Sequence, residues 1–212
     1  MLHKDKNIIA PETFKLIQEL QSLPELKDFY LVGGTTLALL LGHRNSIDID
    51  LFSVNNFEPV EIMEMLSGRY NVLPTTIRKN TLLSKVNDIK VDFISHPYKI
   101  IKPIIIEENI SMLSLEDISA MKLNAIINSG QRIKDFIDIY FLLEHFSIDQ
   151  MLYFYQEKYL VKNDFIPLKA LTYFDDIDLQ IDPPKLLKPL PLKIIQQRII
   201  EGVKHPNKIF NP

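Results

Sequence analysis

The sequence predicts an α+β protein, with strands gathered in its first half and helices in its second. Three observations support this fold class. Apolar and acidic residues alternate with a period of two over residues 47–52, and several other short runs before residue 113 also look like strands. A short apolar run ends at Gly33-Gly34 and is followed by strong helix formers. From Ser114 onward the apolar residues take helical spacing. Runs of strands followed by runs of helices are typical of α+β proteins.

The first half is expected to mix helices and short strands. Helices are predicted for residues 11–22, 35–41 and 58–66, and Pro11 suits a first helical turn. Strands are predicted for residues 29–32, 47–52, 70–72, 81–86 and 89–94. Asn87-Asp88 suits a hairpin turn. Residues 104–106 are either one more strand or an extended connection.

The second half is expected to be helical. Ser114 is followed three residues later by Asp117, which predicts a capped helix that ends near Gly130. Further helices are predicted for residues 133–145, 149–159 and 193–203. Six of the thirteen prolines lie in the last 30 residues, so residues 183–191 should form an extended strap. We therefore expect a lobe that contains the strands over residues 1–112 and a helical region with a Pro-rich basic tail over residues 113–212.

Composition excludes several classes of protein. The chain has 212 residues with 46% hydrophobic composition, which is enough to bury a core. It has no cysteine, so a metal has to be held by oxygen or imidazole ligands, which favours a hard cation such as Mg²⁺. No apolar run approaches the roughly 20 residues that span a bilayer, and the start is not signal-like. We expect a cytoplasmic protein with no membrane segment.

The net charge of −3, from 24 basic and 27 acidic residues, argues against a protein built wholly around nucleic-acid binding. The segment from Pro183 onward is nevertheless basic, because Glu201 is its one acidic residue. Its cations are Lys185, Lys188, Lys193, Arg198, Lys204 and Lys208. Such a run is either a solvated face or a contact surface for RNA phosphates.

Three aspartates are candidate metal ligands. Asp48 and Asp50 share one face of a predicted strand, and Asp92 lies in a second predicted strand. Alternating acids alone mark the solvent face of many strands. Phosphoryl and nucleotidyl transfer, however, use two ions roughly 3.5–4 Å apart, which need bridging carboxylates on a rigid support such as adjacent strands. We therefore expect Asp48, Asp50 and Asp92 to bind Mg²⁺ or Mn²⁺.

The glycine turn has a matching role. Backbone N–H groups at a helix start, here around Gly33, Gly34, Thr35 and Thr36, form a cradle for phosphate. The other interpretation is a simple strand-to-helix reversal that needs a positive φ. Thirteen residues separate Gly34 from Asp48, and the two signals together indicate a nucleotide site more strongly than either alone.

The combined pattern resembles the polymerase-β-type nucleotidyltransferase superfamily and, more narrowly, its AbiEii/AbiGii toxin-like family. The pattern has four parts, which together span about residues 29–143. They are Gly34-Thr35 with Arg44, Ser46, Asp48 and Asp50; Val91-Asp92; Lys122-Leu123-Asn124-Ala125; and Arg132-Ile133-Lys134-Asp135-Phe136-Ile137-Asp138-Ile139. The last part, of the form R-x-K-D-x-x-D-I, is the most specific. A glycine expected after Asp92 is absent, and Ile94-Ser95-His96-Pro97 stands in its place.

The resemblance implies a mixed-sheet nucleotidyltransferase lobe followed by a helical half. It implies that Asp48, Asp50 and Asp92 bind metal and that Lys122 contacts nucleotide phosphates. Arg44 and Arg132 are further candidates for phosphate contacts, with structural salt bridges as the alternative, and the Thr35 and Ser46 hydroxyls keep the capacity to bond phosphate.

Asp135 is the candidate that orients or deprotonates the acceptor hydroxyl, although the sequence does not separate it from Asp138. Structural ion pairs are the alternative for each charged residue. Lys122 would pair with Glu116 or with an acidic strand residue, and Asp135 and Asp138 would pair with Lys134 and Arg132.

The expected function is transfer of a nucleoside monophosphate from an NTP to a hydroxyl on a tRNA or other RNA end, a protein or a small molecule. The family resemblance extends this to the toxin of a toxin–antitoxin or abortive-infection system with an antitoxin protein as partner, although the chain looks short beside toxins with extended C-terminal helical domains. One alternative is a non-catalytic nucleotide- or partner-binding protein that keeps the fold. Another is a nuclease. None of the five histidines has metal-ligand spacing, and none is assigned to catalysis.

Overall fold

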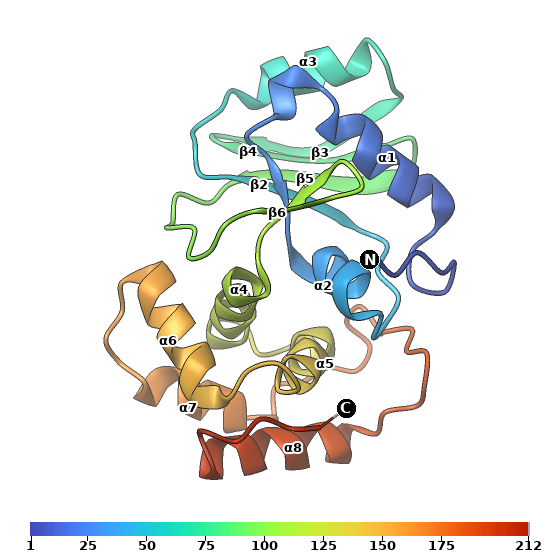
Figure 1. Ribbon diagram of the computed structural model, residues 1–212. Coiled ribbons are helices and arrows are strands. Elements are labelled where there is room, and N and C mark those ends of the chain that lie inside the picture. The colour runs from blue at the N-terminus through green and yellow to red at the C-terminus, as the bar shows by residue number, and fades with distance from the viewer. Residues whose placement is uncertain (212) are drawn as a thin grey trace. The chain divides into compact units, whose positions relative to one another are not determined.

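The computed structural model describes residues 1–211, which form two compact units (Figure 1). The first unit contains residues 1–99 and 103–113. The second contains residues 100–102 and 114–211, so a short segment of the connection belongs to the helical unit. No helix in the described part of the chain is both long and apolar enough to cross a membrane.

The first unit is built on a seven-stranded mixed sheet. Its strands are β1 (Tyr30–Leu31), β2 (Ile49–Ser53), β3 (Val72–Arg78), β4 (Thr81–Val86), β5 (Ile89–Ser95), β6 (Ile105–Glu107) and β7 (Ile110–Met112). They lie in the order β3-β4-β5-β2-β1-β7-β6. The β2/β5 and β1/β7 pairs are parallel and the others are antiparallel. This sheet, with helices in both units, confirms the predicted α+β class.

Helices cover the two faces of the sheet. Helices α1 (Pro11–Gln21) and α3 (Pro59–Ser67) lie on one side, and α2 (Gly33–Leu41) lies on the other (Figure 1). The apolar side chains of α1 and α3 pack in one core cluster with those of β2 and β5. Because strand side chains alternate between faces, the residues between these core positions point to the α2 side.

The register of β2 and β5 sorts their side chains by polarity. Ile49 pairs with Val91 and Leu51 pairs with Phe93, and all four are completely buried. Asp50 pairs with Asp92 between them, on the opposite face. Asp48 lies one residue before β2 begins, not within a strand from residue 47 as expected.

Three strand predictions were incomplete. The predicted strand at residues 70–72 is instead β3, over 72–78, which contains Pro74 beside an irregularity in its pairing. Proline is tolerated there because β3 is an edge strand, although in sequence it reads as a break. The run at residues 104–106, predicted as a strand or a connection, corresponds to strand β6 over residues 105–107, but β7 was missed. The two are joined by Glu108-Asn109, both at positive φ, which is a hairpin turn without glycine.

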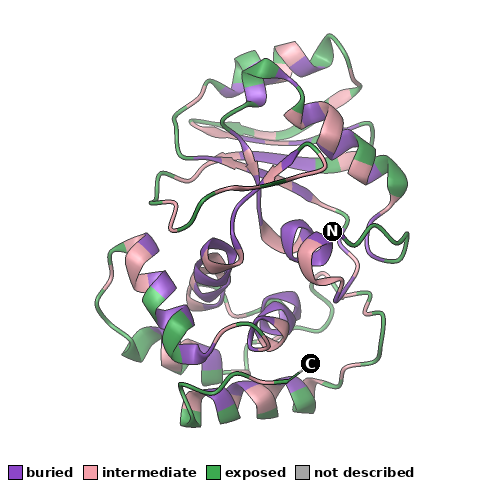
Figure 2. Ribbon diagram, in the orientation of Figure 1, coloured by how far each residue is buried: buried purple, intermediate pink, exposed green. Residues whose placement is uncertain are grey.

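The second unit consists of helices α4 (Leu115–Asn128), α5 (Ile133–Leu142), α6 (Ile148–Tyr159), α7 (Phe165–Thr172) and α8 (Leu192–Lys204). Helix α4 packs against α5, α6 and α7, and α8 packs against α5 and α7. Figure 2 shows α5 buried along most of its length and α8 buried on one side. Helix α7 was not predicted, because Pro167 reads as a break although it stands in the first turn, where proline is accepted. Residues 183–191 contain no helix or strand, as expected.

Asp117 connects three segments of the helical unit. Its buried carboxylate accepts hydrogen bonds from the amides of Ile101 and Lys102, at 3.0 to 3.2 Å, and from the hydroxyl of the N-cap residue Ser114 at 2.8 Å. Lys158 of α6 adds an ion pair of 2.7 Å, and both side chains are at most 1% exposed. The predicted cap at Ser114 therefore also fixes the connection and α6.

This network predicts an unequal response to removing its two charges. Asp117→Ala leaves the Lys158 ammonium buried without its carboxylate, so unfolding free energy should fall by about 3–5 kcal/mol. Lys158→Met should cost less, because three other donors still bond Asp117. Urea unfolding of the full chain measures both, with the exposed Lys162→Met as control. Equal losses, or losses no larger than that of the control, would contradict the assignment.

Candidate active site

The three predicted metal-binding aspartates lie together on the α2 side of the sheet. Asp50 and Asp92 are cross-strand neighbours, and Asp48 precedes β2 on the same face. The Lys90 ammonium joins two of them, at 3.0 Å from Asp92 Oδ2 and 3.9 Å from Asp48 Oδ2. Asp92 is 7% exposed, whereas Asp48 and Asp50 are half-buried. The first unit thus gathers the acidic residues that the sequence predicted would converge.

The glycine turn lies directly against this cluster. Gly33 has φ +71°, and a Cβ atom there would be 2.7 Å from Asp50 Oδ2. Only glycine satisfies both the backbone conformation and the close approach. The start of α2, where the first N–H groups have no helical partner, therefore lies beside the Asp50 carboxylate. This juxtaposition is what a phosphate-binding turn next to metal-binding carboxylates requires.

Arg44 closes the other side of the turn. Arg44 is 2% exposed, and a Cβ atom on Gly34 would be only 2.3 Å from its Nη2. Nη1 donates to the carbonyl of Asn45 at 2.9 Å. A buried guanidinium adds positive charge behind the helix start, which favours an anion there.

The hydroxyls of Thr35 and Ser46, predicted to bond phosphate, form hydrogen bonds within the protein. Thr35 Oγ1 donates to the carbonyl oxygen of Asp48 and lies 2.9 Å from Ser46 Oγ. Because a hydroxyl has one hydrogen, Ser46 is the donor in the second bond. Thr36 is completely buried, and its hydroxyl has no hydrogen-bond partner among residues 1–211. Thr35 and Ser46 thus fix Asp48 relative to α2, while their contact with phosphate stays a prediction.

The acidic cluster has oxygen ligands of the type that Mg²⁺ and Mn²⁺ prefer. Asp92 Oδ1 is buried and has no hydrogen-bond partner in the described chain, which is the state of an oxygen that a cation would satisfy. Nevertheless, no group of three or more acidic or histidine side chains within residues 1–211 is arranged to hold a metal ion. The donor set fits a hard cation, but its side chains are spread around Lys90.

Lys90 is a residue of this site that the sequence analysis missed. Burial alone would lower its pKa, but the hydrogen bond to Asp92 and the charges of Asp48, Asp92 and Asp50 outweigh burial and raise the pKa above its usual value. The ammonium is therefore firmly charged. The sequence could have indicated it, because in a strand the side chain two positions before Asp92 lies on the same face as Asp92.

The predicted residues of the second unit form a separate buried cluster. Lys122 on α4 is 2.8 Å from Asp135 Oδ1 and 2.7 Å from Asp138 Oδ2, both on α5. The side chains of Lys122, Asp135 and Asp138 are 9%, 7% and 0% exposed. The anionic partners of Lys122 are therefore these two aspartates. Arg132 and Lys134, which the sequence offered as partners for Asp135 and Asp138, pair elsewhere.

Arg132 and Lys134 both contact Asp182, the residue directly before the Pro-rich strap. Arg132 Nη2 lies 2.9 Å from Asp182 Oδ2, and Lys134 is bonded to the other carboxylate oxygen. Partial burial raises the pKa of Asp182, but the hydrogen bonds and charges of Lys134 and Arg132 outweigh it, so that pKa is lowered. Asp182 therefore stays ionised, and it anchors the strap to the start of α5. The role of Arg132 as a phosphate contact stays a prediction.

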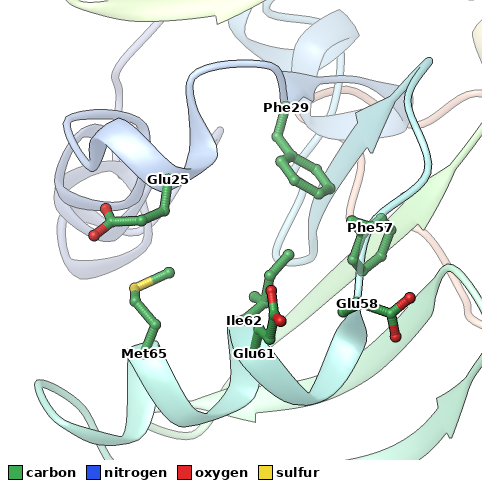
Figure 3. A pocket seen from close by; sticks show the side chains of 7 residues that line it. All are labelled: Glu25, Phe29, Phe57, Glu58, Glu61, Ile62 and Met65. Carbon is green, nitrogen blue, oxygen red and sulfur yellow. The ribbon is translucent and has the colours of Figure 1, made fainter.

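The first unit has a pocket of about 230 Å³ (Figure 3). It lies on the α1 and α3 side of the sheet, where the Phe29 and Phe57 rings meet edge to face at 5.1 Å. It is lined by Glu25, Phe29, Phe57, Glu58, Glu61, Ile62 and Met65. None of the predicted site residues lines this pocket, so it is distinct from the acidic cluster.

Comparison with known families assigns the chain. A family model described as "Nucleotidyl transferase AbiEii toxin, Type IV TA system" matches residues 15–201. The chain belongs to the AbiEii family. The match covers both units, and it includes the aspartates and glycine turn of the first unit and the Lys122–Asp135–Asp138 cluster of the second. AbiEii membership makes the chain a nucleotidyltransferase and confirms the resemblance stated from its motifs.

Individual proteins agree with this assignment. The uncharacterized protein aq_aa25 of Aquifex aeolicus (strain VF5) is 30% identical over 176 residues, which cover 79% of this chain and 84% of that protein. Among solved structures, JHP933 from Helicobacter pylori has a TM-score of 0.59 at 17% identity, covering 92% of this chain and 89% of its own. Another H. pylori protein, assigned as a nucleotidyltransferase, has a TM-score of 0.58 at 16% identity and covers 92% of both chains. These two structures show that the fold is shared.

The packing of the turn predicts that Gly34 tolerates no side chain. Gly34→Ala forces the new methyl group into the buried Arg44 guanidinium, so stability should fall by about 1–3 kcal/mol and nucleotide binding should weaken. Gly68→Ala is a matched control, because its Cβ would be 3.6 Å from the nearest atom and its φ of −70° suits alanine. Thermal unfolding of the two variants measures the difference. A Gly34→Ala protein as stable as Gly68→Ala would refute the close packing.

Proposed function

We propose that this AbiEii protein transfers a nucleoside monophosphate from an NTP to a hydroxyl acceptor and that it depends on Mg²⁺ or Mn²⁺. One observation carries the proposal. Asp50 stands opposite Asp92 and against Gly33, so carboxylates for metal and a helix start for phosphate meet at one place in the first unit. A nuclease would use the carboxylates but has less need of the phosphate-binding turn.

Asp48, Asp50 and Asp92 are the residues that would hold the metal. When bound, the metal neutralises the triphosphate oxygens and lowers the pKa of the acceptor hydroxyl. The N–H groups around Gly33, Gly34, Thr35 and Thr36 would bind phosphate oxygens, and Arg44 would favour their negative charge from behind the turn. Asp48 is kept in place for this role by the hydrogen bond that its carbonyl accepts from Thr35.

The proposed step forms a bond from the acceptor oxygen to the α-phosphorus of the NTP. The bond from that phosphorus to the oxygen of the leaving pyrophosphate breaks, and the proton of the acceptor hydroxyl goes to Asp135. Of the two aspartates on α5, Asp135 is the better candidate because the Asp138 side chain is wholly buried. Lys122, bonded to both carboxylates, holds Asp135 in place, and its contact with nucleotide phosphate stays part of the proposal.

We further propose that the acceptor is an RNA end, a protein side chain or a small molecule, and that the protein acts as a toxin opposed by an antitoxin. The family description supports this part of the proposal. The basic segment after Pro183 would favour an RNA acceptor, because its lysines can neutralise phosphates. Incubation with each labelled NTP, Mg²⁺ or Mn²⁺, and total RNA or protein would identify the fraction that is labelled.

Loss of a metal-binding carboxylate is expected to abolish transfer. Asp48→Asn, Asp50→Asn and Asp92→Asn should each lower the rate at least about a hundredfold, because even outer-shell changes at metal sites cost that order. Asp88→Asn in the neighbouring hairpin turn keeps the positive φ, which asparagine accepts, and is the matched control. Labelled-nucleotide transfer is the measurement. Nucleotide binding without turnover by the wild-type protein would favour a non-catalytic binding protein instead.

Variants of the two aspartates of α5 are expected to differ in their rate of nucleotide transfer. Asp135→Asn is expected to lower the transfer rate about 10² to 10⁴-fold through loss of the base. Asp138→Asn should instead lower the melting temperature, because Lys122 loses a wholly buried counter-charge, and should retain much of the rate per folded molecule. The transfer rates and melting curves of both variants decide the assignment. Full activity of Asp135→Asn would exclude Asp135 as the base.

A further inference from the structure

A lysine stands among the carboxylates that the proposed metal would need. Lys90 lies two residues before Asp92 on β5, so both side chains leave the same face of the sheet. The parallel register that pairs Ile49 with Val91 leaves Asp48 beside Lys90. The Lys90 ammonium is within 3.0 Å of Asp92 and 3.9 Å of Asp48.

The charges explain why this position needs a cation. Asp50 and Asp92 are adjacent on one face, and carboxylates on neighbouring strand positions repel. The Asp92 side chain is only 10% exposed, so water screens its charge weakly. Lys90 supplies the missing positive charge from within the chain.

Lys90 is also placed so that it can leave. Its side chain is 49% exposed, and a lysine stem can carry its ammonium into water without disturbing the strand. Departure of the ammonium would free Asp92 Oδ2, beside the Oδ1 atom that has no hydrogen-bond partner within residues 1–211. A single cation could then use both oxygens of Asp92 together with Asp48.

We propose that Lys90 is the internal counterion of the acidic cluster and that a divalent metal binds by displacing it. The inference rests on the metal site of the proposed function. Without metal, Lys90 holds Asp48 and Asp92 in place. This explains why the carboxylates lie close together but do not converge on one point where a metal ion could bind. With metal, the lysine competes for the same carboxylates, so it is a positioning residue that also sets metal affinity.

The test is calorimetric titration of the full-length protein with Mn²⁺ alone, without nucleotide. Lys90→Met should bind Mn²⁺ roughly tenfold more tightly than wild type, since a competing charge has been removed. Lys90→Arg keeps the charge and should stay within about twofold of wild type. Lys79→Met is the control, because Lys79 is an exposed lysine in the turn between β3 and β4, so its loss should change affinity by no more than about twofold.

Melting curves give a second readout that does not depend on activity. Metal-free Lys90→Met should unfold a few degrees below wild type, and saturating Mn²⁺ should remove the difference. Lys90→Gln should behave in the same way, which guards against an effect of methionine itself. If Lys90→Met melts below wild type by the same amount with and without Mn²⁺, Lys90 only stabilises the strand and the inference is overturned.

The two possible failures are distinguishable. Unchanged or weaker Mn²⁺ affinity in folded Lys90→Met, with wild type binding normally, overturns the counterion inference and leaves the metal site standing. Failure of wild type to bind Mn²⁺ at millimolar concentration overturns the metal dependence of the proposed function, and the counterion inference with it.

Discussion

The parallel pairing of β2 with β5 is the constraint on which the first unit depends. The register that buries Ile49, Leu51 and Phe93 with α1 and α3 forces Asp50 and Asp92 to face the other way. A slip of one residue would turn the carboxylates toward the hydrophobic core and the apolar side chains toward α2. The hydrophobic core thus fixes the position of the acidic residues, and folding and site assembly are one event.

Close approach is the second requirement of the site, and two glycines provide it. Gly33 admits the Asp50 carboxylate and Gly34 admits the Arg44 guanidinium, so opposite charges flank the start of one helix. In the second unit, buried charges are likewise matched by partners, as Lys122 is by Asp135 and Asp138. Such clusters are costly to break and hold their members in one geometry.

The sequence predicted the elements whose signals are local. The glycine turn, the strand around Asp50 and the cap at Ser114 can each be recognised from a few neighbouring residues, and the structure has all three, although Asp48 precedes the strand. Strand β3 and helix α7 were misjudged because proline reads as a break, while the edge of a sheet and the first turn of a helix both accept it. Contacts between residues distant in sequence could not be predicted from the sequence. Nothing near Arg132 and Lys134 indicates Asp182, about 50 residues away, because only the path of the strap brings them together.

The Asp117 network has a consequence for where the two units can be separated. The amides of Ile101 and Lys102 bond a carboxylate of the helical unit, although residues 103–113 return to the sheet. A helical fragment that begins at Ser114 would therefore lack two of the donors of a wholly buried acid, and a sheet fragment that ends at Met112 would carry them unbonded. The chain passes between its two units more than once, so cutting it at one position does not separate them. A construction that inserts, permutes or exchanges one unit has to keep residues 100–102 with the helical unit.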